Sequence, residues 1–157
     1  MTGLDFSDLD AFIRDLSEIA ELPDETAGEL LQAQAEIVVE AQKRSAAAHG
    51  LVDSGQLQES IRADKKMKAK SGTRYVEVYP RGKRKKRTRY RMSKGDREAG
   101  KSRAVTNSEV AFIHEYGAPG KHIKAKQWIK KANEGAADQA LEAAAAVYNQ
   151  YLKNKNL

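Results

Sequence analysis

The densest set of chemically active side chains lies in residues 81–103, which hold twelve Lys or Arg against only Asp96 and Glu98. Ammonium and guanidinium groups bind phosphates and carboxylates, and a block of like charge repels itself until an anionic partner neutralises it. The sequence therefore predicts a site that binds anions here. The candidate DNA- or partner-contacting residues are Lys83, Arg84, Lys85, Lys86, Arg87, Arg89 and Arg91.

This cationic stretch admits three interpretations. It could contact the phosphate backbone of a nucleic acid without regard to sequence, with Tyr90 as a stacking surface. It could dock on an acidic protein surface, including that of a neighbouring copy, because residues 1–63 carry thirteen acidic and four basic side chains. It could also be a solvated loop. Four further lysines, Lys65, Lys66, Lys68 and Lys70, extend the charge on the N-terminal side.

Other residues capable of chemistry give weak signals. His114 beside Glu115 could be an acid/base pair, but on the strand expected there the two would point to opposite faces. His49 and His122 lie apart from any metal-binding spacing, and Gly82-Lys83 lacks the context of a phosphate loop. The chain has no cysteine, which excludes disulfides, thiolate metal sites and thiol nucleophiles. We expect no enzyme activity, no cofactor and no metal.

Helices are expected on both sides of the cationic stretch. Residues 1–22 form a first amphipathic helix with acidic residues on its polar face, because apolar side chains recur every three or four positions at Leu9, Phe12, Ile13, Leu16, Ile19 and Ala20. Leu22-Pro23 interrupts this pattern, and a long helix follows over 24–49. A C-terminal helix is expected over 124–153, where alanines allow close helix contact. No apolar run approaches the roughly 20 residues that span a bilayer, so we expect no membrane association.

Between the helices the apolar period changes to two. Strands over 59–69 and 73–79 joined by Ser71-Gly72, and a further strand over 109–116, predict an antiparallel sheet within 59–116 that carries the basic insertion 81–103. The expected fold is a single α+β domain over 1–157. In it a small sheet of three or four strands is packed by the N-terminal helix pair and the C-terminal helix.

Two blocks of sequence resemble a known family. LVDSGQLQESI follows the long helix, and SEVAFIHEYGAPGKHIKAKQWIKKANE follows the basic insertion. Together they are similar to the tail-completion or neck proteins of long-tailed bacteriophages, whose helix ends in an Asp-Thr-Gly-x-Leu-x-x-Ser-Ile-like motif. The matching positions are Asp53, Ser54, Gly55, Leu57, Ser60 and Ile61, followed in the second block by Val110, Ala111, Glu115, Tyr116, Gly117, Ala125 and Trp128.

The resemblance implies a virion structural protein at the head–tail junction that is assembled in the host cytoplasm. It also implies that several copies form a homo-oligomeric ring and that the protein has no catalytic activity. It implies as partners the other neck and tail proteins (stopper or connector, tail terminator and tail tube) and the DNA that passes through the channel. The residue types of the two blocks also suit structural roles. Asp53 and Ser54 suit caps, Gly55 and Gly117 suit turns, and Trp128 suits a core anchor.

Overall fold

The computed structural model describes residues 22–51, 55–83 and 105–155. Its helices are α2 (Asp24–Ala48), α3 (Gln56–Ser60), α5 (Asn107–Tyr116), the short 3-10 helix η1 (Pro119–Lys121) and α6 (Trp128–Asn154). Its strands are β1 (Ile61–Ala63), β2 (Lys68–Lys70), β3 (Thr73–Tyr75) and β4 (Val78–Pro80). The α+β class predicted from the sequence is confirmed for this part of the chain.

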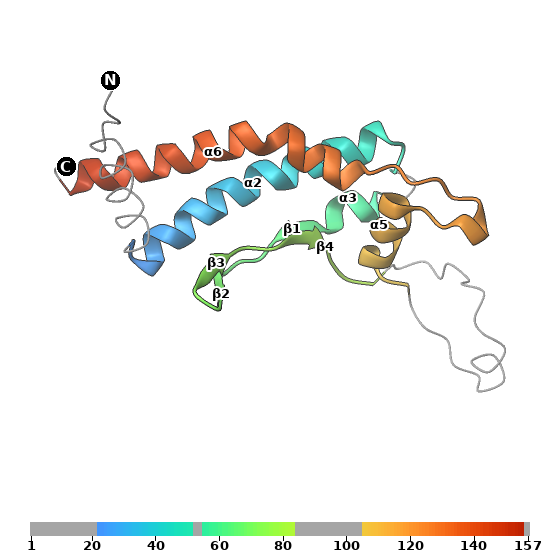
Figure 1. Cartoon of the computed structure of the whole chain (residues 1–157), viewed down its shortest axis with the longest axis horizontal. Coiled ribbons are helices and arrows are strands. Elements are labelled where there is room, and N and C mark those ends of the chain that lie inside the picture. The colour runs from blue at the N-terminus through green and yellow to red at the C-terminus, as the bar shows by residue number, and fades with distance from the viewer. Residues whose placement is uncertain (1–21, 52–54, 84–104, 156–157) are drawn as a thin grey trace, which may run out of the picture.

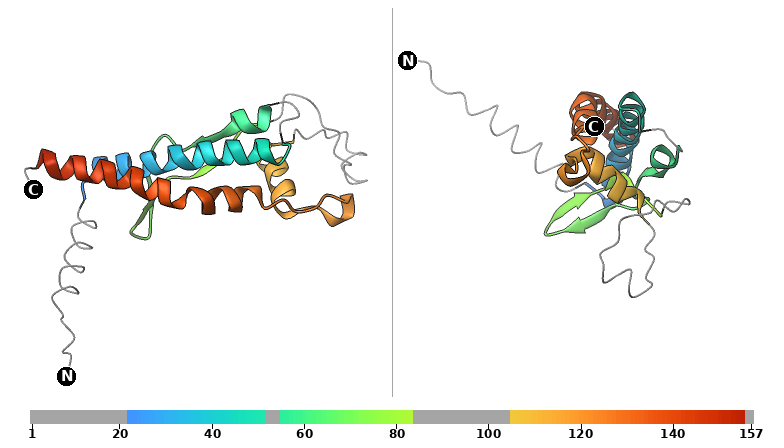
Figure 2. Two further views of the ribbon diagram at one scale, coloured as in Figure 1. Left: turned by 90° about the horizontal axis from the view of Figure 1, so that it is seen from above. Right: turned by 90° about the vertical axis from the view of Figure 1, so that its right-hand side faces the viewer.

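An antiparallel pair of long helices, α2 and α6, forms the body of the molecule (Figures 1 and 2). Alanines recur at every fourth position of α6, so they lie on one face of the helix and allow the two backbones to approach closely. These buried alanines are Ala132, Ala136, Ala140 and Ala144, and α2 contributes Ala27, Ala35 and Ala41. Close helix contact through these small residues is therefore present within the chain, and on α6 it begins at Ala132. Gly135 does not interrupt α6.

The strands form one long antiparallel hairpin alongside α2 (Figure 1). Near its base β1 pairs with β4, with Arg62 opposite Tyr79, and near its tip β2 pairs with β3. Ser71 and Gly72 connect β2 to β3 with φ values of 51° and 79°, as a two-residue hairpin turn with two positive φ angles requires. The sequence predicted this turn correctly, although the strands are shorter than expected and residues 56–60 are helical.

The expected strand over 109–116 is wrong, because these residues form helix α5. The apolar alternation was read over too few residues to separate a strand from a helix. A capping box decides the outcome: Thr106 Oγ1 accepts from the Glu109 backbone N–H at 3.1 Å, and the Thr106 N–H donates to Glu109 Oε2 at 2.9 Å. The described strands therefore make two two-stranded ladders and not one sheet of three or four strands.

The start of the C-terminal helix differs from the sequence-based expectation, and the first expected helix cannot be compared with the structure. The C-terminal helix begins at Trp128 and not at residue 124, because Gln127 has a φ of +50° and residues 126 and 127 bond to the end of α5. The first helix, expected over 1–22, lies outside the described residues except for Leu22, as do residues 84–103 of the basic insertion.

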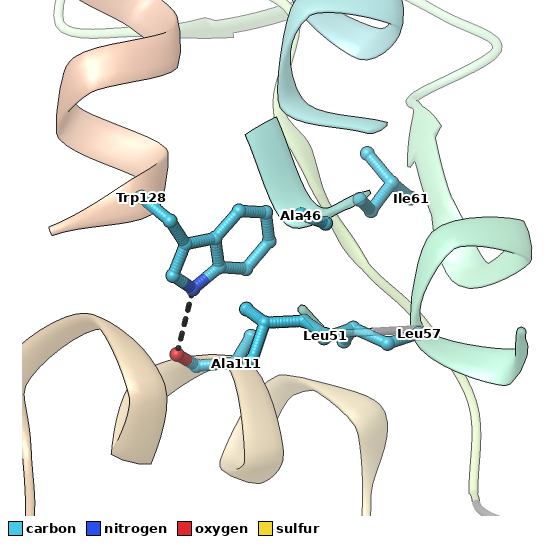
Figure 3. Packing of buried hydrophobic residues seen from close by; sticks show 6 residues of the cluster. All are labelled: Ala46, Leu51, Leu57, Ile61, Ala111 and Trp128. Carbon is cyan, nitrogen blue, oxygen red and sulfur yellow. Dashed lines mark hydrogen bonds between the residues drawn. The ribbon is translucent and has the colours of Figure 1, made fainter. Parts of the chain in front are cut away.

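The main hydrophobic core joins α2, α3, β1, α5 and the start of α6 (Figure 3). Trp128 is fully buried at its centre, and its indole Nε1–H donates to the Ala111 carbonyl at 3.4 Å. The other buried members are Ala46, Leu51, Leu57 and Ile61. The two sequence blocks that resemble the phage family therefore meet in one core, since Leu57 and Ile61 come from the first and Trp128 and Ala111 from the second.

Candidate functional site

The two ends of the basic insertion are held together at the fold by backbone and side-chain hydrogen bonds. Lys83 forms an isolated antiparallel bridge with Thr106, and the Asn107 N–H donates to the Gly82 carbonyl at 2.9 Å. The Asn107 side chain donates to the Arg81 carbonyl at 2.7 Å, and the Ser108 hydroxyl donates to the Pro80 carbonyl. The residues on either side of 84–104 are therefore held together, so the insertion leaves and rejoins the fold at one place.

Arg81 lies at the point where the insertion leaves the fold, and its charge is already paired within the chain. Its guanidinium pairs with the buried Asp64 carboxylate and lies 4.6 Å from the centre of the Tyr79 ring. The hydrogen bond to Asp64 raises the pKa of Arg81. Arg81 was counted in the cationic stretch, but its charge is compensated where it stands.

Lys68 is compensated in the same way. Its ammonium lies 2.7 Å from Asp64 Oδ2 and 2.5 Å from Glu77 Oε2, and the hydrogen bond with Asp64 raises its pKa. Asp64 is thus the centre of a cluster that ties the two strands of the hairpin to the start of the insertion. The hydrogen bond from Lys68, followed by that from Arg81, holds the pKa of Asp64 below its ordinary value of about 3.8.

The ion pairs of Asp64 should make the stability of the fold depend on pH in the acid range. A carboxylate whose folded-state pKa is lowered contributes stability above its unfolded-state pKa, and that contribution is lost as the pH falls through the folded-state pKa. We expect Asp64→Asn to lower the urea midpoint at neutral pH, and the difference from the unsubstituted chain to shrink as the pH falls from about 5 to about 2. Glu142→Gln, at an exposed position of α6, is the control and should leave the midpoint unchanged. A difference that stays constant over this pH range would contradict the prediction.

Exposed cations remain on the hairpin and at the insertion. Lys65, Lys66, Lys70 and Lys83 are all exposed. The other predicted contact residues, Arg84, Lys85, Lys86, Arg87, Arg89 and Arg91, lie outside the described residues, so their role stays a prediction.

A stripe of acidic residues runs along α2. Glu25, Glu29, Glu36 and Glu40 are exposed. Their spacings of four, seven and four residues place them within about 60° of one another around the helix axis, over about 22 Å of its length. The sequence indicated an acidic N-terminal region, and the helix arranges part of it as this acidic stripe. One member, Glu40, pairs with Lys43 at 2.9 Å.

The first family-like block surrounds α3. Gly55 has a φ of +67° at the N-terminus of this helix, a conformation that favours glycine. Leu57 and Ile61 are buried in the core, and the buried Ser60 hydroxyl donates to the Leu57 carbonyl at 2.7 Å. These positions are therefore placed to support packing. Asp53 and Ser54 lie outside the described residues.

The second block forms the junction between α5 and α6. Glu115 is buried, and its two carboxylate oxygens accept from the backbone N–H groups of Ile129 at 2.7 Å and Lys130 at 3.1 Å. Those N–H groups belong to the first turn of α6 and have no partner within the helix. Glu115 thus acts as a cap for a helix other than its own, which the sequence does not indicate.

Removing the Glu115 carboxylate should destabilise the junction. We expect Glu115→Ala to lower the free energy of unfolding by about 2 kcal/mol, since two charge-assisted bonds and a favourable charge near a helix N-terminus are lost. Glu115→Gln keeps an oxygen acceptor and should lose less. Urea unfolding followed by circular dichroism measures both. Glu134→Ala, an exposed control, should stay within about 0.5 kcal/mol. A Glu115→Ala variant as stable as this control would show that the cap contributes nothing.

The remaining residues of the second block differ in exposure. Gly117 is half-buried and ends α5, whereas Ala125 is exposed in the segment before α6. Tyr116 is 66% exposed and its ring lies 4.7 Å from that of Phe112, which is 62% exposed. This aromatic pair could not be expected from a strand over 109–116, because residues four apart on a strand lie about 13 Å apart along it, whereas on a helix they are neighbours.

The structure does not bring an acid/base or metal site together in the described part of the chain. Glu115 caps α6, and His114 is the neighbouring residue on helix α5, not on a strand. His49 bonds through Nδ1 to the Ser45 carbonyl at the end of α2, and His122 lies in a turn. No cluster of three or more His, Asp or Glu is placed to hold a metal within residues 22–51, 55–83 and 105–155. In the same residues no helix has the length and apolarity needed to cross a membrane.

The comparisons with known proteins support the family that the first sequence block resembles. A family model described as "Bacteriophage HK97-gp10, putative tail-component" matches residues 10–95, which is more than half of the chain. The match includes α2, α3 and the hairpin and ends inside the basic insertion. No curated protein and no solved structure matches the chain.

Proposed function

The chain belongs to the HK97-gp10-like family of bacteriophage tail components, and from this we propose that it acts at the head–tail junction in tail completion and head–tail joining, as one subunit of an oligomeric ring. The family is one of structural virion proteins, so the chain is a component of the phage tail and not an enzyme. Its partners are other virion proteins. In the proposal these are the stopper or connector, the tail terminator and the tail tube, with DNA passing through the ring.

The observation that carries the ring proposal is the separation of charge on the fold. The basic insertion leaves the fold beside α5, and the acidic stripe lies on the exposed surface of α2. The two regions belong to different elements, and every copy carries both. The basic insertion of one copy can therefore contact the acidic stripe of its neighbour. Complementary charges of this kind steer association and fix the orientation of the partners.

A contact between two different surfaces has a structural consequence. When each subunit uses one surface to bind the other surface of its neighbour, the contact is heterologous. Repetition of this contact builds a closed ring of subunits or an open helical filament. The rigid α2–α6 pair fixes the relation between the two surfaces, because closely packed helices cannot change their spacing freely. The proposal thus assigns a mechanical role to the helix pair and a binding role to the insertion and the acidic stripe.

Charge exchange tests this interface. One variant changes Lys83, Arg84, Lys85 and Lys86 to Glu, and a second combines Glu29→Lys with Glu36→Lys. We expect the unsubstituted protein to form a discrete oligomer by light scattering, weakened at about 0.5 M salt, and each variant to stay monomeric with an unchanged circular dichroism spectrum. Both sets of changes on one chain should restore the oligomer, because the two charges are then exchanged together.

A matched control separates the interface from a general effect of charge. Asp138→Lys with Glu142→Lys reverses two exposed charges on α6 and should leave the oligomer intact. If the four-residue insertion variant still assembles like the unsubstituted protein, the insertion does not form the subunit interface.

A second candidate function is sequence-independent nucleic-acid binding by the basic hairpin. The exposed pair Phe112 and Tyr116 lies on α5, which begins at Asn107, shortly after the insertion, and could offer stacking surfaces beside the cations. In that case a monomer should bind short duplex DNA with micromolar affinity that falls steeply with salt. Light scattering with and without DNA distinguishes the two candidates. A monomer that gains mass only with DNA, and loses it in salt, favours this second function.

A further inference from the structure

An apolar groove is lined by the beginning of α2 and the second half of α6. These parts form the end of the helix pair that is farther from α5 (Figure 1). The volume of the groove is about 440 Å³, and its walls include Leu22, Leu30, Leu31, Leu141, Ala145 and Tyr148. Leu141 is 66% exposed within the described residues. A concave row of leucines at the surface is unusual for a soluble domain unless another segment packs against it.

The chain enters the described fold at this groove. Leu22 is the first described residue, is only 5% exposed and lines the groove. Arg74 holds it in place, because its Nη1 donates to the Leu22 carbonyl at 2.8 Å and its Nη2 lies 2.9 Å from Asp24 Oδ1. The 21 residues that precede Leu22 are therefore tethered at the groove itself.

The sequence of that tethered segment suits the groove. On a helix over 7–20 the larger apolar side chains and Ala20 fall within about 120° of one another around the axis, and the acidic residues of this stretch lie outside that arc. The apolar set is Leu9, Phe12, Ile13, Leu16, Ile19 and Ala20, and the acidic set is Asp8, Asp10, Asp15 and Glu18. A helix over 7–20 would be about 21 Å long, long enough to lie along the groove beside Ala27 to Gln34. A short connection at residues 21–23 is ordinary for two antiparallel helices.

We propose that the N-terminal segment of the same chain, residues 7–20, docks its apolar face into this groove as a third helix beside α2 and α6. The tether favours this occupant, because a segment attached at the rim is present at a local concentration in the millimolar range. The proposal does not depend on the ring or on the charge of the insertion. The other occupants are the same segment of a neighbouring copy and a different protein, and the experiment distinguishes them.

The absence of cysteine from the chain provides a direct test in the full-length protein. An antiparallel arrangement about residue 22 brings Leu16 near Ala145 and Phe12 near Leu141. We expect Leu16→Cys with Ala145→Cys, and Phe12→Cys with Leu141→Cys, to form disulfides within one chain under mild oxidation. Glu18→Cys with Ala145→Cys is the matched control, because Glu18 lies on the opposite face of the same helix, and it should crosslink at least tenfold more slowly.

The products of oxidation decide the outcome. A monomer with an internal disulfide, formed at a rate independent of protein concentration, supports docking within the chain. A disulfide-linked dimer would overturn the proposal and assign the groove to a neighbouring copy. Crosslinking no faster than in the Glu18 control would overturn docking of this segment altogether.

Hydrogen exchange on the full chain without cysteines gives an independent readout. We expect the amides of residues 9–20 to exchange at least tenfold more slowly than an unstructured segment. Leu141→Asp should remove that protection while the amides of α5 keep theirs. Unprotected exchange of residues 9–20 in the unsubstituted protein would contradict the proposal even if the cysteine variants failed to fold.

Discussion

Replacing Trp128 with alanine is expected to lower the free energy of unfolding by about 3–5 kcal/mol, the typical cost of truncating a large buried aromatic side chain. Trp128 is fully buried and is the first residue of α6. Its ring fills the space between the end of α2, α3 and α5, so the variant would leave a cavity that these elements cannot easily close (Figure 3). It would also leave the Ala111 carbonyl without the indole donor.

The measurement is urea unfolding at neutral pH, followed by far-ultraviolet circular dichroism. Tryptophan fluorescence cannot be used for the variant, because Trp128 is the only tryptophan in the chain. Phe112→Ala is the control, since this aromatic side chain is 62% exposed, and it should cost less than about 1 kcal/mol. Similar losses in the two variants would show that the core shared by the two sequence blocks does not hold the fold together.

The long elements could be predicted because their patterns repeat over many residues. The helix expected over 24–49 is α2 (Asp24–Ala48), and the C-terminal helix was misplaced by only a few residues at its start. The turn at Ser71-Gly72 was also predictable, because a Ser-Gly dipeptide between two β-forming segments commonly marks a turn, and Gly72 readily accepts the positive φ that a tight hairpin demands.

The short elements could not be predicted from apolar spacing alone. Residues 107–116 alternate in part and also repeat at four, and only the buried side chains, Asn107, Ala111 and Glu115, show which period holds. The useful signal was Thr106 followed three residues later by Glu109, since this pair commonly begins a helix. Local capping chemistry was more informative here than hydrophobicity.

The candidate site shows a different limit of sequence reasoning. Counting charges identified a cationic region of the sequence, but it could not tell that Asp64 and Glu77 together compensate Lys68 and Arg81. Asp64 and Arg81 are 17 residues apart, and only the hairpin brings them together. In the same way, nothing near Glu115 in the sequence indicates that it caps α6 through residues 14 and 15 positions later.

Replacing Gly117 with alanine should be nearly as damaging as the loss of Trp128. Gly117 has φ +81° and ψ 173°, a region of backbone conformation that is almost restricted to glycine and costs other residues about 1–3 kcal/mol. A Cβ atom at this position would lie 2.8 Å from the Ala125 nitrogen and 2.9 Å from the Ile123 oxygen. Both neighbours are backbone atoms, so the chain itself would have to move. We expect a total loss of about 3 kcal/mol or more.

The strain should appear first at the junction between α5 and α6. The Lys126 and Gln127 N–H groups donate to the His114 and Glu115 carbonyls at 2.8 and 3.1 Å, and displacement of residues 123–125 would stretch these bonds. Hydrogen exchange at the two amides should therefore accelerate in Gly117→Ala, together with the loss measured by urea unfolding. Gly120→Ala is the control, because a Cβ atom there meets open space, and it should change stability by no more than about 0.5 kcal/mol. If both alanine variants unfold at the same midpoint, the close approach at Gly117 is relieved at no cost, and the glycine of this sequence block needs an explanation other than backbone geometry.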